Sequence, residues 1–285
     1  MTTHTSPASA SGAFSIGQDM TVNRLGYGAM RVTGRGIWGP PADKVQARQV
    51  LKKTLDLGIN FIDTADSYGP YVSEELIREA LHPYPEGLLI ATKGGLERPG
   101  PDKWTVNGRP DHLEAALKGS LQRLKVDRID LYQLHRFDDK VPADEFLDKL
   151  KELQQQGYIR HLGLSEVSRA QIEQAQQFFP VVSIQNKYSI TERKWEEELH
   201  WTAKQGIGFI PWYPLDAGAL EHPLLLRLAD KYQASVYQIA LAWLLAHSPN
   251  MLPIPGTSSV THLVENTEAA RLQLDPEDIK AITDM

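Results

Sequence analysis

Eight short apolar segments of strand character recur along this chain and place the strongest limit on its fold. They are RLGYGA, INFID, LLIATK, IDLYQLH, IRHLGLS, VVSIQ, IGFIPW and MLPIP. Helical patterns such as KVQARQVLKKTLDL and DHLEAALKGSLQRL, with apolar residues three and four positions apart, lie between them. Strands that alternate with helices are typical of a parallel sheet. Eight of them in 285 residues favour a (β/α)8 TIM barrel of the α/β class over an open doubly wound sheet.

The barrel is predicted to occupy residues 13–285 as a single domain, because no linker or low-complexity region divides this part of the chain. Its first segments, AFSIG and MTVN, predict a β-hairpin ahead of the first barrel strand. The residues before them, MTTHTSPASASG, are small and polar. We therefore predict that residues 1–12 form a flexible N-terminal tail.

Composition and charge disfavour several classes of function. The formal net charge of -6 argues against nucleic acid as a partner, because binding to phosphates requires a basic surface. The absence of cysteine excludes disulfides, thiolate metal sites and a cysteine nucleophile. No apolar stretch reaches the roughly 18 residues that a membrane span needs. The expected protein is cytoplasmic, binds no membrane and acts on small molecules without a metal.

Polar side chains stand at the C-terminal ends of the predicted strands, where the loops of a (β/α)8 barrel build the active site. In chain order they are Asp63, Lys93, His135, Ser165 with Glu166, Gln185 and Trp212. One such residue alone is more often structural than catalytic. Together they predict a functional site at this end of the barrel.

Three of these side chains, together with a nearby tyrosine, are suited to activating a carbonyl group. Tyr68 follows Asp63 by five residues, so the loop between them can return the phenol over the strand end. Lys93 would face the barrel interior, where its ammonium needs a carboxylate partner such as Asp63. That ammonium would lower the pKa of Tyr68 from the ordinary value of about 10 and make it a usable general acid. His135 could hydrogen-bond the substrate oxygen.

The residues alone leave other assignments open. Tyr71 could take the place of Tyr68, and Asp66 could be a helix cap or a loop residue. The loop predicted after the third strand, LERPGPDKWTVNGRP, is long. Its Trp104 could wall the substrate pocket, as could Trp38 after the first strand, or both could anchor their loops.

Several longer phrases resemble a known family. RLGYGAM, NFIDTADSYG, LIATKGG, DLYQLH, GLSEVS, SIQNKYS and PIPGTSSVTHLVEN follow one another in this order and look like the aldo-keto reductase superfamily, over essentially the whole chain after the tail. The resemblance implies a barrel whose N-terminal hairpin caps its bottom, with a catalytic tetrad of Asp63, Tyr68, Lys93 and His135. It also implies hydride transfer from NADPH to an aldehyde or ketone, which becomes an alcohol, with Tyr68 as proton donor and no metal.

The resemblance further implies a set of residues that bind the nicotinamide cofactor. Ser165, Glu166 and Gln185 match positions that hydrogen-bond the carboxamide, and Trp212 matches the aromatic residue that stacks on the ring. The other implied contacts are Met30, Arg31 and Asp63 near the first strands, Tyr213, Pro214, Leu215, Asp216 and Gly218 at the pyrophosphate, and Gly256, Thr257, Ser258, His262, Glu265 and Asn266 at the adenosine end.

Two departures from the family pattern affect the cofactor. Glu166 stands where many members have asparagine, so the amide donor is lost although an acceptor remains. The stretch GTSSVTHL offers Ser258 and His262 where many members place lysine and arginine around the adenosine ribose. Because a helix N-terminus can also bind phosphate, NADPH is the first choice of cofactor and NADH the second.

Three functions are compatible with this sequence. The main prediction is a reductase of small carbonyl compounds, similar to bacterial members of the family proposed to reduce pyridoxal. The alternative is a redox-sensing regulatory module of the same fold that binds cofactor with little turnover. A third is a barrel that performs non-redox chemistry, such as proton abstraction by Lys93 and Asp63. Protein partners and oligomeric state are not predicted.

Overall fold

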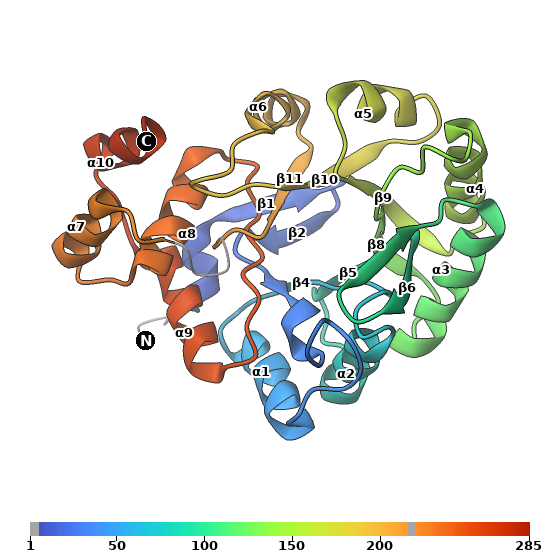
Figure 1. Cartoon of the computed structure of the whole chain (residues 1–285), viewed down its shortest axis with the longest axis horizontal. Helices are drawn as coiled ribbons and strands as arrows, with labels where there is room; N and C mark the ends of the chain where they lie inside the picture. Colours follow the sequence, from blue (N-terminus) through green and yellow to red (C-terminus); the bar gives the residue numbers. More distant parts are fainter. Residues whose placement is uncertain (1–5, 216–219) are drawn as a thin grey trace.

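Seven of the eight predicted strands form one parallel sheet that curls around a central axis (Figure 1). The computed structural model describes residues 6–215 and 220–285. The sheet order is β11-β10-β9-β8-β5-β4-β3. The strands are β3 (Tyr27–Gly28), β4 (Phe61–Asp63), β5 (Leu89–Gly94), β8 (Ile129–Leu134), β9 (Ile159–Ser165), β10 (Val181–Lys187) and β11 (Gly208–Trp212).

The eighth predicted segment, MLPIP, closes the barrel without forming a regular strand. On one side, Leu252 N donates to Phe209 O at 2.8 Å, and Met251 forms an isolated parallel bridge to Phe209. On the other side, Gly26 N donates to Pro253 O at 2.9 Å. The two prolines in the segment have no N–H to give to a ladder, which explains why the pairing stays this short. The (β/α)8 barrel is therefore the fold of this chain.

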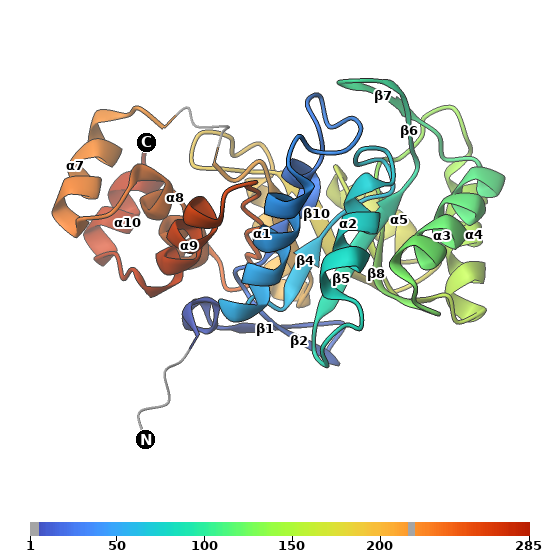
Figure 2. The same cartoon turned by 90° about the horizontal axis from the view of Figure 1, so that it is seen from below.

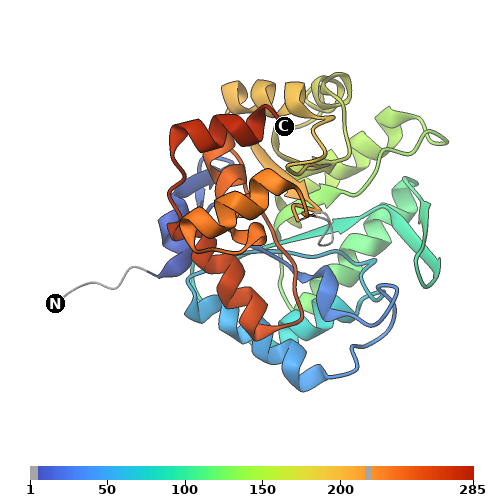
Figure 3. The same ribbon diagram turned by 60° about the vertical axis from the view of Figure 1, so that its left-hand side comes forward.

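Helices surround the sheet. They are α1 (Lys44–Asp56), α2 (Val72–Leu81), α3 (Pro110–Leu124), α4 (Ala143–Gln155), α5 (Arg169–Ala175), α6 (Glu196–Gln205), α7 (Pro223–Tyr232), α8 (Val236–His247), α9 (Val260–Glu268) and α10 (Pro276–Thr283), with short 3-10 helices η1 (Pro7–Ser11), η2 (Ala29–Val32) and η4 (Ala269–Arg271). In α4, for example, the residues spaced three and four apart are the buried ones. Figure 3 shows α7 to α10 gathered on one side of the barrel, where the outermost helices, α7 and α10, pack against other helices.

The N-terminal hairpin is present and plugs the bottom of the barrel. It consists of β1 (Ala13–Ile16) and β2 (Met20–Asn23), and Figure 2 shows it at the opposite end from the loops after β5. Its buried residues Ile16 and Val22 join a core cluster with Phe61 from β4 and Ile210 from β11. The hairpin thus supplies the apolar floor of the barrel.

The predicted tail is wrong for its last part. Pro7–Ser11 form η1, in which Ala8 is fully buried and donates its N–H to Leu57 O at 3.0 Å. The small side chains that suggested disorder allow this segment to pack closely against the end of α1. Residues 1–5 of the predicted tail lie outside the described residues.

The long loop predicted after the third strand is instead an antiparallel hairpin, β6 (Leu96–Gly100) with β7 (Lys103–Val106). It rises from the C-terminal end of the barrel (Figure 2). Among the described residues, no helix is long and apolar enough to cross a membrane. The described residues also contain no group of three or more histidine, aspartate or glutamate side chains that could bind a metal ion.

Candidate active site

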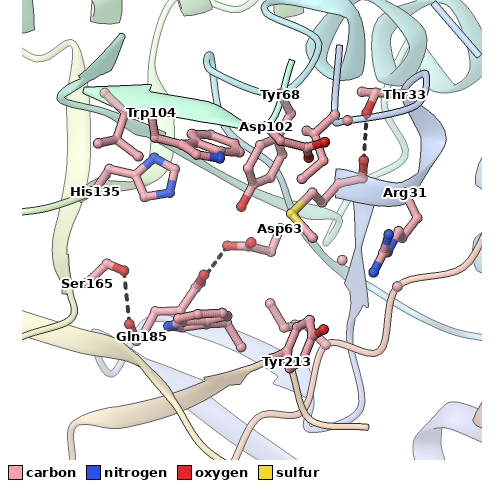
Figure 4. Close-up of a pocket in the computed structure, with 18 of the residues that line it drawn as sticks. Arg31, Thr33, Asp63, Tyr68, Asp102, Trp104, His135, Ser165, Gln185 and Tyr213 are labelled. Atoms are coloured by element: carbon pink, nitrogen blue, oxygen red, sulfur yellow. Dashed lines mark hydrogen bonds between the residues drawn. The ribbon is translucent and has the colours of Figure 1, made fainter. Parts of the chain in front are cut away.

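A cavity of about 900 Å³ opens at the C-terminal ends of the strands (Figure 4). Its volume is in the range of sites for cofactors and large ligands. The predicted residues that line it are Met30, Arg31, Asp63, Tyr68, His135, Ser165, Gln185, Trp212, Tyr213, Pro214, Leu215, Gly256 and Ser258. Residues from distant parts of the chain therefore meet here because parallel strands all end at the same edge.

Lys93 lies behind the cavity wall, where it joins Asp63 to Tyr68. It is fully buried, and its Nζ is 2.6 Å from Asp63 Oδ1, 2.8 Å from Thr64 O and 3.4 Å from Tyr68 Oη. The ammonium is thus held by a carboxylate and a carbonyl while its remaining side faces the phenol. Burial lowers the pKa of Lys93, but Asp63 and Tyr68 raise it by more than burial lowers it. The net pKa therefore lies above its ordinary value. Lys93 is therefore a cation at neutral pH.

The other oxygen of Asp63 is held by two glutamines. Gln133 Nε2 lies 3.0 Å and Gln185 Nε2 2.9 Å from Asp63 Oδ2. Gln133 is fully buried on β8 and was missed from the sequence. Because side chains alternate along a strand, its position two residues before His135 was the signal that it faces the barrel interior. The hydrogen bond between Lys93 and Asp63, with two further bonds donated by the ammonium and two accepted by the carboxylate, keeps this pair rigid.

The loop after β4 returns Tyr68 over Asp63, as the sequence suggested. The side chain is 7% exposed and its hydroxyl points toward Asp63 in Figure 4. The alternative, Tyr71, is 49% exposed and packs on Arg123, whose guanidinium carbon lies 4.2 Å from the centre of the ring. It does not line the cavity. Of the two tyrosines, Tyr68 is the one placed at the site.

The sequence predicted a lowered pKa for Tyr68, and this prediction is wrong. Burial raises the pKa of Tyr68 more than the neighbouring Lys93 lowers it, and the net pKa is above the ordinary value. The sequence argument counted the cation but not the loss of water around the phenol. Tyr68 therefore carries its proton throughout the neutral range, and Lys93 stabilises the phenolate that would form when this proton leaves.

His135 faces Tyr68 across the same wall. The ring centres lie 6.0 Å apart, and His135 Nδ1 is 3.5 Å from Ser67 Oγ. Burial, with the charges of Lys93 and Arg136 nearby, lowers the pKa of His135 well below its ordinary value. The imidazole is thus neutral at neutral pH and can act as a hydrogen-bond donor rather than as an acid.

Trp104 forms the outer wall of the cavity beside these two rings. It lies at the start of β7, with ring centres 6.3 Å from Tyr68 and 6.4 Å from His135. The guanidinium carbon of Arg98 stacks 3.7 Å from the centre of its ring, which fixes the indole in place. Trp38 does not line the cavity and anchors its loop through a bridge to Gly69.

Ser165, Gln185 and Trp212 form the opposite wall. Ser165 Oγ donates to Gln185 O at 3.0 Å and accepts from Arg136 Nη1 at 2.9 Å, so its hydroxyl is already engaged. Gln185 uses its amide N–H groups on Asp63 and Gln133, while its Oε1 accepts no hydrogen bond from the described residues. An acceptor beside a flat indole suits an aromatic ring that carries an amide.

Glu166 was expected at the cofactor, but its side chain does not line the cavity. It has a positive φ of 54°, and its Oε1 accepts from Trp212 Nε1 and from Lys187 N, both at 2.6 Å. This left-handed conformation turns the side chain toward the edge of the indole. The hydrogen bond from Trp212 Nε1 orients the indole, and the one from Lys187 N holds the carboxylate in place.

The far end of the cavity is shaped by glycines and by the start of α9. A Cβ on Gly28 would lie 2.7 Å from Ile254 O, and one on Gly256 would lie 2.7 Å from Gly28 O. Ser258 lines the cavity just before Ser259, the N-cap of α9. Such a helix N-terminus can bind an anionic group. The backbone approach and the free acceptor of Gln185 therefore fit a long dinucleotide.

Several predicted cofactor residues lie away from the cavity lining, namely Thr257, His262, Glu265 and Asn266. Thr257 Oγ1 accepts from Ser259 N at 3.0 Å, and Glu265 O accepts from Gln238 Nε2 at 3.0 Å. Asp216 and Gly218 lie outside the described residues. The described cavity is therefore bounded by Gly256 and Ser258 at this end.

Asp66, which the sequence left as a cap or loop residue, is a buried carboxyl behind the site. It is 3% exposed, and its Oδ1 has no partner among the described residues. Burial and the nearby Glu74 raise the pKa of Asp66 well above its ordinary value. Glu74 itself is paired, with its Oε2 2.6 Å from Arg123 Nε. Asp66 is therefore a buried carboxyl, shifted toward its neutral form, within the loop that carries Tyr68.

Comparison with known proteins connects this barrel to oxidoreductases. The chain is 53% identical over 272 residues to an uncharacterized oxidoreductase of Schizosaccharomyces pombe, covering 95% of this chain and 88% of that protein. It is 40% identical over 280 residues to pyridoxine 4-dehydrogenase of Escherichia coli, covering 96% and 98%. The solved glycerol dehydrogenase of Gluconobacter oxydans matches with a TM-score of 0.87 and 30% identity, covering 96% of this chain and 95% of that one.

A NAD(P)H-dependent oxidoreductase is the class that this barrel and its site define. The model of the aldo/keto reductase family matches residues 24–285, and the chain belongs to that family. A thermostable aldo-keto reductase in complex with the inhibitor epalrestat has the same fold, with a TM-score of 0.84 and 31% identity over 95% of this chain and 98% of that one. The family relationship supports carbonyl reduction with NADP(H) and a small carbonyl substrate.

Proposed function

We propose that this protein reduces an aldehyde or ketone with NADPH and that Tyr68 is the proton donor. The observation that carries the proposal is the buried Asp63–Lys93 pair with its ammonium 3.4 Å from the Tyr68 hydroxyl. The ammonium does not require a phenol beside it for the stability of the fold. It is suited to stabilising the phenolate that proton donation leaves behind.

NADPH held in this cavity would supply the hydride for the carbonyl carbon, and the side chains of this chain handle the proton. Tyr68 Oη gives its proton to the carbonyl oxygen, and the alcohol forms. Lys93 Nζ stabilises the resulting phenolate, which regains a proton from solvent. His135, neutral because of the lowered pKa, donates a hydrogen bond to the same carbonyl oxygen and orients it. Gln133 and Gln185 hold Asp63 so that the ammonium stays in place.

NADPH is the proposed cofactor because the cavity end expected for its adenosine is cationic. Arg31 lines this end together with Ser258, next to the N-terminus of α9. An arginine supplied from η2 compensates for the missing basic residues in GTSSVTHL. A 2′-phosphate would meet the guanidinium and the helix terminus, whereas NADH would leave both without a partner.

Pyridoxal is the proposed substrate type. The support is the 40% identity to pyridoxine 4-dehydrogenase over 96% of this chain. The flat aromatic wall of Trp104 beside Tyr68 suits an aromatic aldehyde of this kind. The reverse reaction, oxidation of pyridoxine, would use the same groups with Tyr68 as the base.

Replacement of Tyr68 by phenylalanine tests the proposal. Tyr68→Phe should reduce the rate of NADPH oxidation with pyridoxal about 100- to 10,000-fold, the usual contribution of a general acid. The variant should still bind NADPH, as measured by the quenching of tryptophan fluorescence. The matched control is Tyr71→Phe, which removes the hydroxyl of the exposed neighbour and should leave the rate unchanged.

Two results would contradict the proposal. Retention of activity in Tyr68→Phe would remove the proton donor from the mechanism. Binding of NADPH by the wild type without turnover on a broad panel of aldehydes would instead favour the regulatory alternative.

A further inference from the structure

Arg136 is a half-buried cation that lines the cavity and has no carboxylate partner among the residues that the structure describes. It directly follows His135 at the end of β8. Its Nη1 donates to His135 O at 2.6 Å and to Ser165 Oγ at 2.9 Å. Its Nε and Nη2 make no hydrogen bond within residues 6–215 and 220–285, and no carboxylate oxygen of these residues lies within ion-pair distance. Part of the guanidinium fork therefore remains available.

The surroundings of Arg136 leave its charge incompletely balanced. Burial lowers the pKa of Arg136, and the more distant Glu166 only partly opposes this effect. Glu166 directs its Oε1 to Trp212 and Lys187 instead. A cation removed from water without a paired anion is costly, unless a ligand supplies the anion. The planar fork of arginine is suited to a carboxylate or another oxyanion.

The position of Arg136 indicates that the anion belongs to the substrate and not to the phosphate groups of a dinucleotide. Its guanidinium carbon lies 5.9 Å from the centre of the Trp212 ring, and the next residue along the chain is His135. The phosphate groups of a dinucleotide are expected instead at the end of the cavity with Gly256 and Ser258. An anion bound by Arg136 would therefore lie only a few atoms from a carbonyl oxygen held by His135.

The hairpin side of the cavity carries charges of both signs, because Asp102 there faces Arg98, the residue that lies over Trp104. Asp102, in the turn between β6 and β7, lines the cavity near Trp104. A carboxylate there repels a negatively charged group. Arg136 has no such carboxylate within ion-pair distance among the described residues, which favours an orientation with the anionic part of the substrate toward β8.

We propose that Arg136 is a specificity-determining residue that binds an oxyanion adjacent to the reacting carbonyl. The favoured substrates are aryl aldehydes with an ionisable hydroxyl at the ortho position and 2-oxo acids, which share this arrangement. The proposal rests on the carbonyl reduction proposed above and deepens it. Pyridoxal, with its hydroxyl next to the formyl group, is one member of the first class.

Two pairs of compounds separate the oxyanion from the rest of the substrate. The first is 3-hydroxypyridine-4-carbaldehyde with pyridine-4-carbaldehyde, which differ by the hydroxyl. The second is phenylglyoxylate with its methyl ester, which differ by the charge. In the wild type we expect kcat/KM to be about 10- to 100-fold higher for the anionic member of at least one pair, the usual effect of a hydrogen bond to a charged group. The pair that shows it identifies the source of the oxyanion.

Substitution of the arginine should remove this preference. Arg136→Gln should lose about 10- to 100-fold in kcat/KM on the anionic member and stay within about threefold on the neutral one. Arg136→Lys should restore part of the preference, because the charge remains without the fork. Arg169→Gln is the matched control, since Arg169 also lies over a tryptophan, Trp201, but on the outer surface of α5. It should behave as the wild type.

A binding measurement gives an answer that does not depend on turnover. Calorimetry of both pairs with the NADP⁺-loaded protein should show the anionic member of at least one pair binding about tenfold or more tightly, and Arg136→Gln should equalise the affinities within that pair. Equal affinities within both pairs in the wild type, or a loss in Arg136→Gln that is the same for both members of a pair, would overturn the inference. So would a parallel loss of NADPH affinity, which would assign Arg136 to the cofactor. Failure of the proposed reductase function would appear separately, as the absence of NADPH oxidation with all four compounds.

Discussion

Replacement of Lys93 by methionine tests the central feature of the site, the buried pair of Lys93 and Asp63. Methionine has a similar length and fills the space of the lysine stem without its charge. In the structure Lys93 is fully buried and Asp63 is 2% exposed, with Nζ and Oδ1 2.6 Å apart. Removal of one partner leaves the other charge buried and uncompensated.

The expected cost follows from this burial. Breaking a buried pair on one side typically costs about 3–5 kcal/mol. Two glutamine amides still donate to the second oxygen of Asp63, so we expect Lys93→Met to lower the free energy of unfolding by about 3 kcal/mol, the lower end of that range. Turnover should fall about 100-fold or more, because the phenolate of Tyr68 loses its stabilising cation.

A double-mutant cycle isolates the interaction. Asp63→Asn alone leaves the ammonium buried and should also destabilise the protein. The double variant should be less destabilised than the sum of the single variants by about 2–3 kcal/mol. Urea denaturation gives these energies, provided that circular dichroism and fluorescence report coincident transitions.

The reasoning would be refuted if the loss of stability in the double variant equalled the sum of the losses in the two single variants. It would also fail if Lys93→Met kept both its stability and its turnover. Additivity would mean that each group is stabilised by other partners, such as Thr64 O for the ammonium, and that the ion pair carries no special weight.

Two further predictions concern residues around the site. The pKa of Asp66 is raised by burial and by Glu74, so the folded protein holds this proton more tightly than the unfolded chain does. Its contribution to stability is complete below the ordinary carboxyl pKa and is lost as pH rises toward the folded value. Asp66→Asn should therefore stabilise the protein by about 1–3 kcal/mol, with a rise in Tm that is larger at mildly alkaline than at mildly acidic pH; a pH-independent change would contradict this. Glu166→Leu should weaken NADPH binding about tenfold, because Trp212 loses a charge-assisted hydrogen bond, whereas Glu166→Gln, which keeps an acceptor, should lose less. Fluorescence titration measures both affinities, and equal losses would show that the hydrogen bond does not position the indole.

The helix boundaries show how far local pattern reaches. The helix-ending residues Gly58, Gly157 and Gly206 have positive φ values of 78°, 85° and 68°, and Ser168 with Gln171 forms a capping box. Asp111 and Glu114 have the same three-residue spacing, but Asp111 does not cap α3. The helix begins at Pro110, which is well suited to a first helical position, so Asp111 lies within the first turn and pairs with Arg109.

The chain order of strands and helices was enough to predict the barrel and to bring Asp63, Lys93 and His135 to one edge. This works because parallel strands in such a barrel all end on the same face, whatever the details of their packing. The N-terminal hairpin and the family resemblance followed from equally local signals.

Tertiary structure alone decided the electrostatics of the site. The pKa of Tyr68 depends on how much water the phenol loses, which outweighs the effect of Lys93 and has no signature in the sequence. Glu166 turned toward Trp212 because it adopts a left-handed backbone conformation that is rare for glutamate. Arg136 could be read from the sequence as a charge, but only the placed side chains of residues 6–215 and 220–285 show that none of their carboxylates pairs with it.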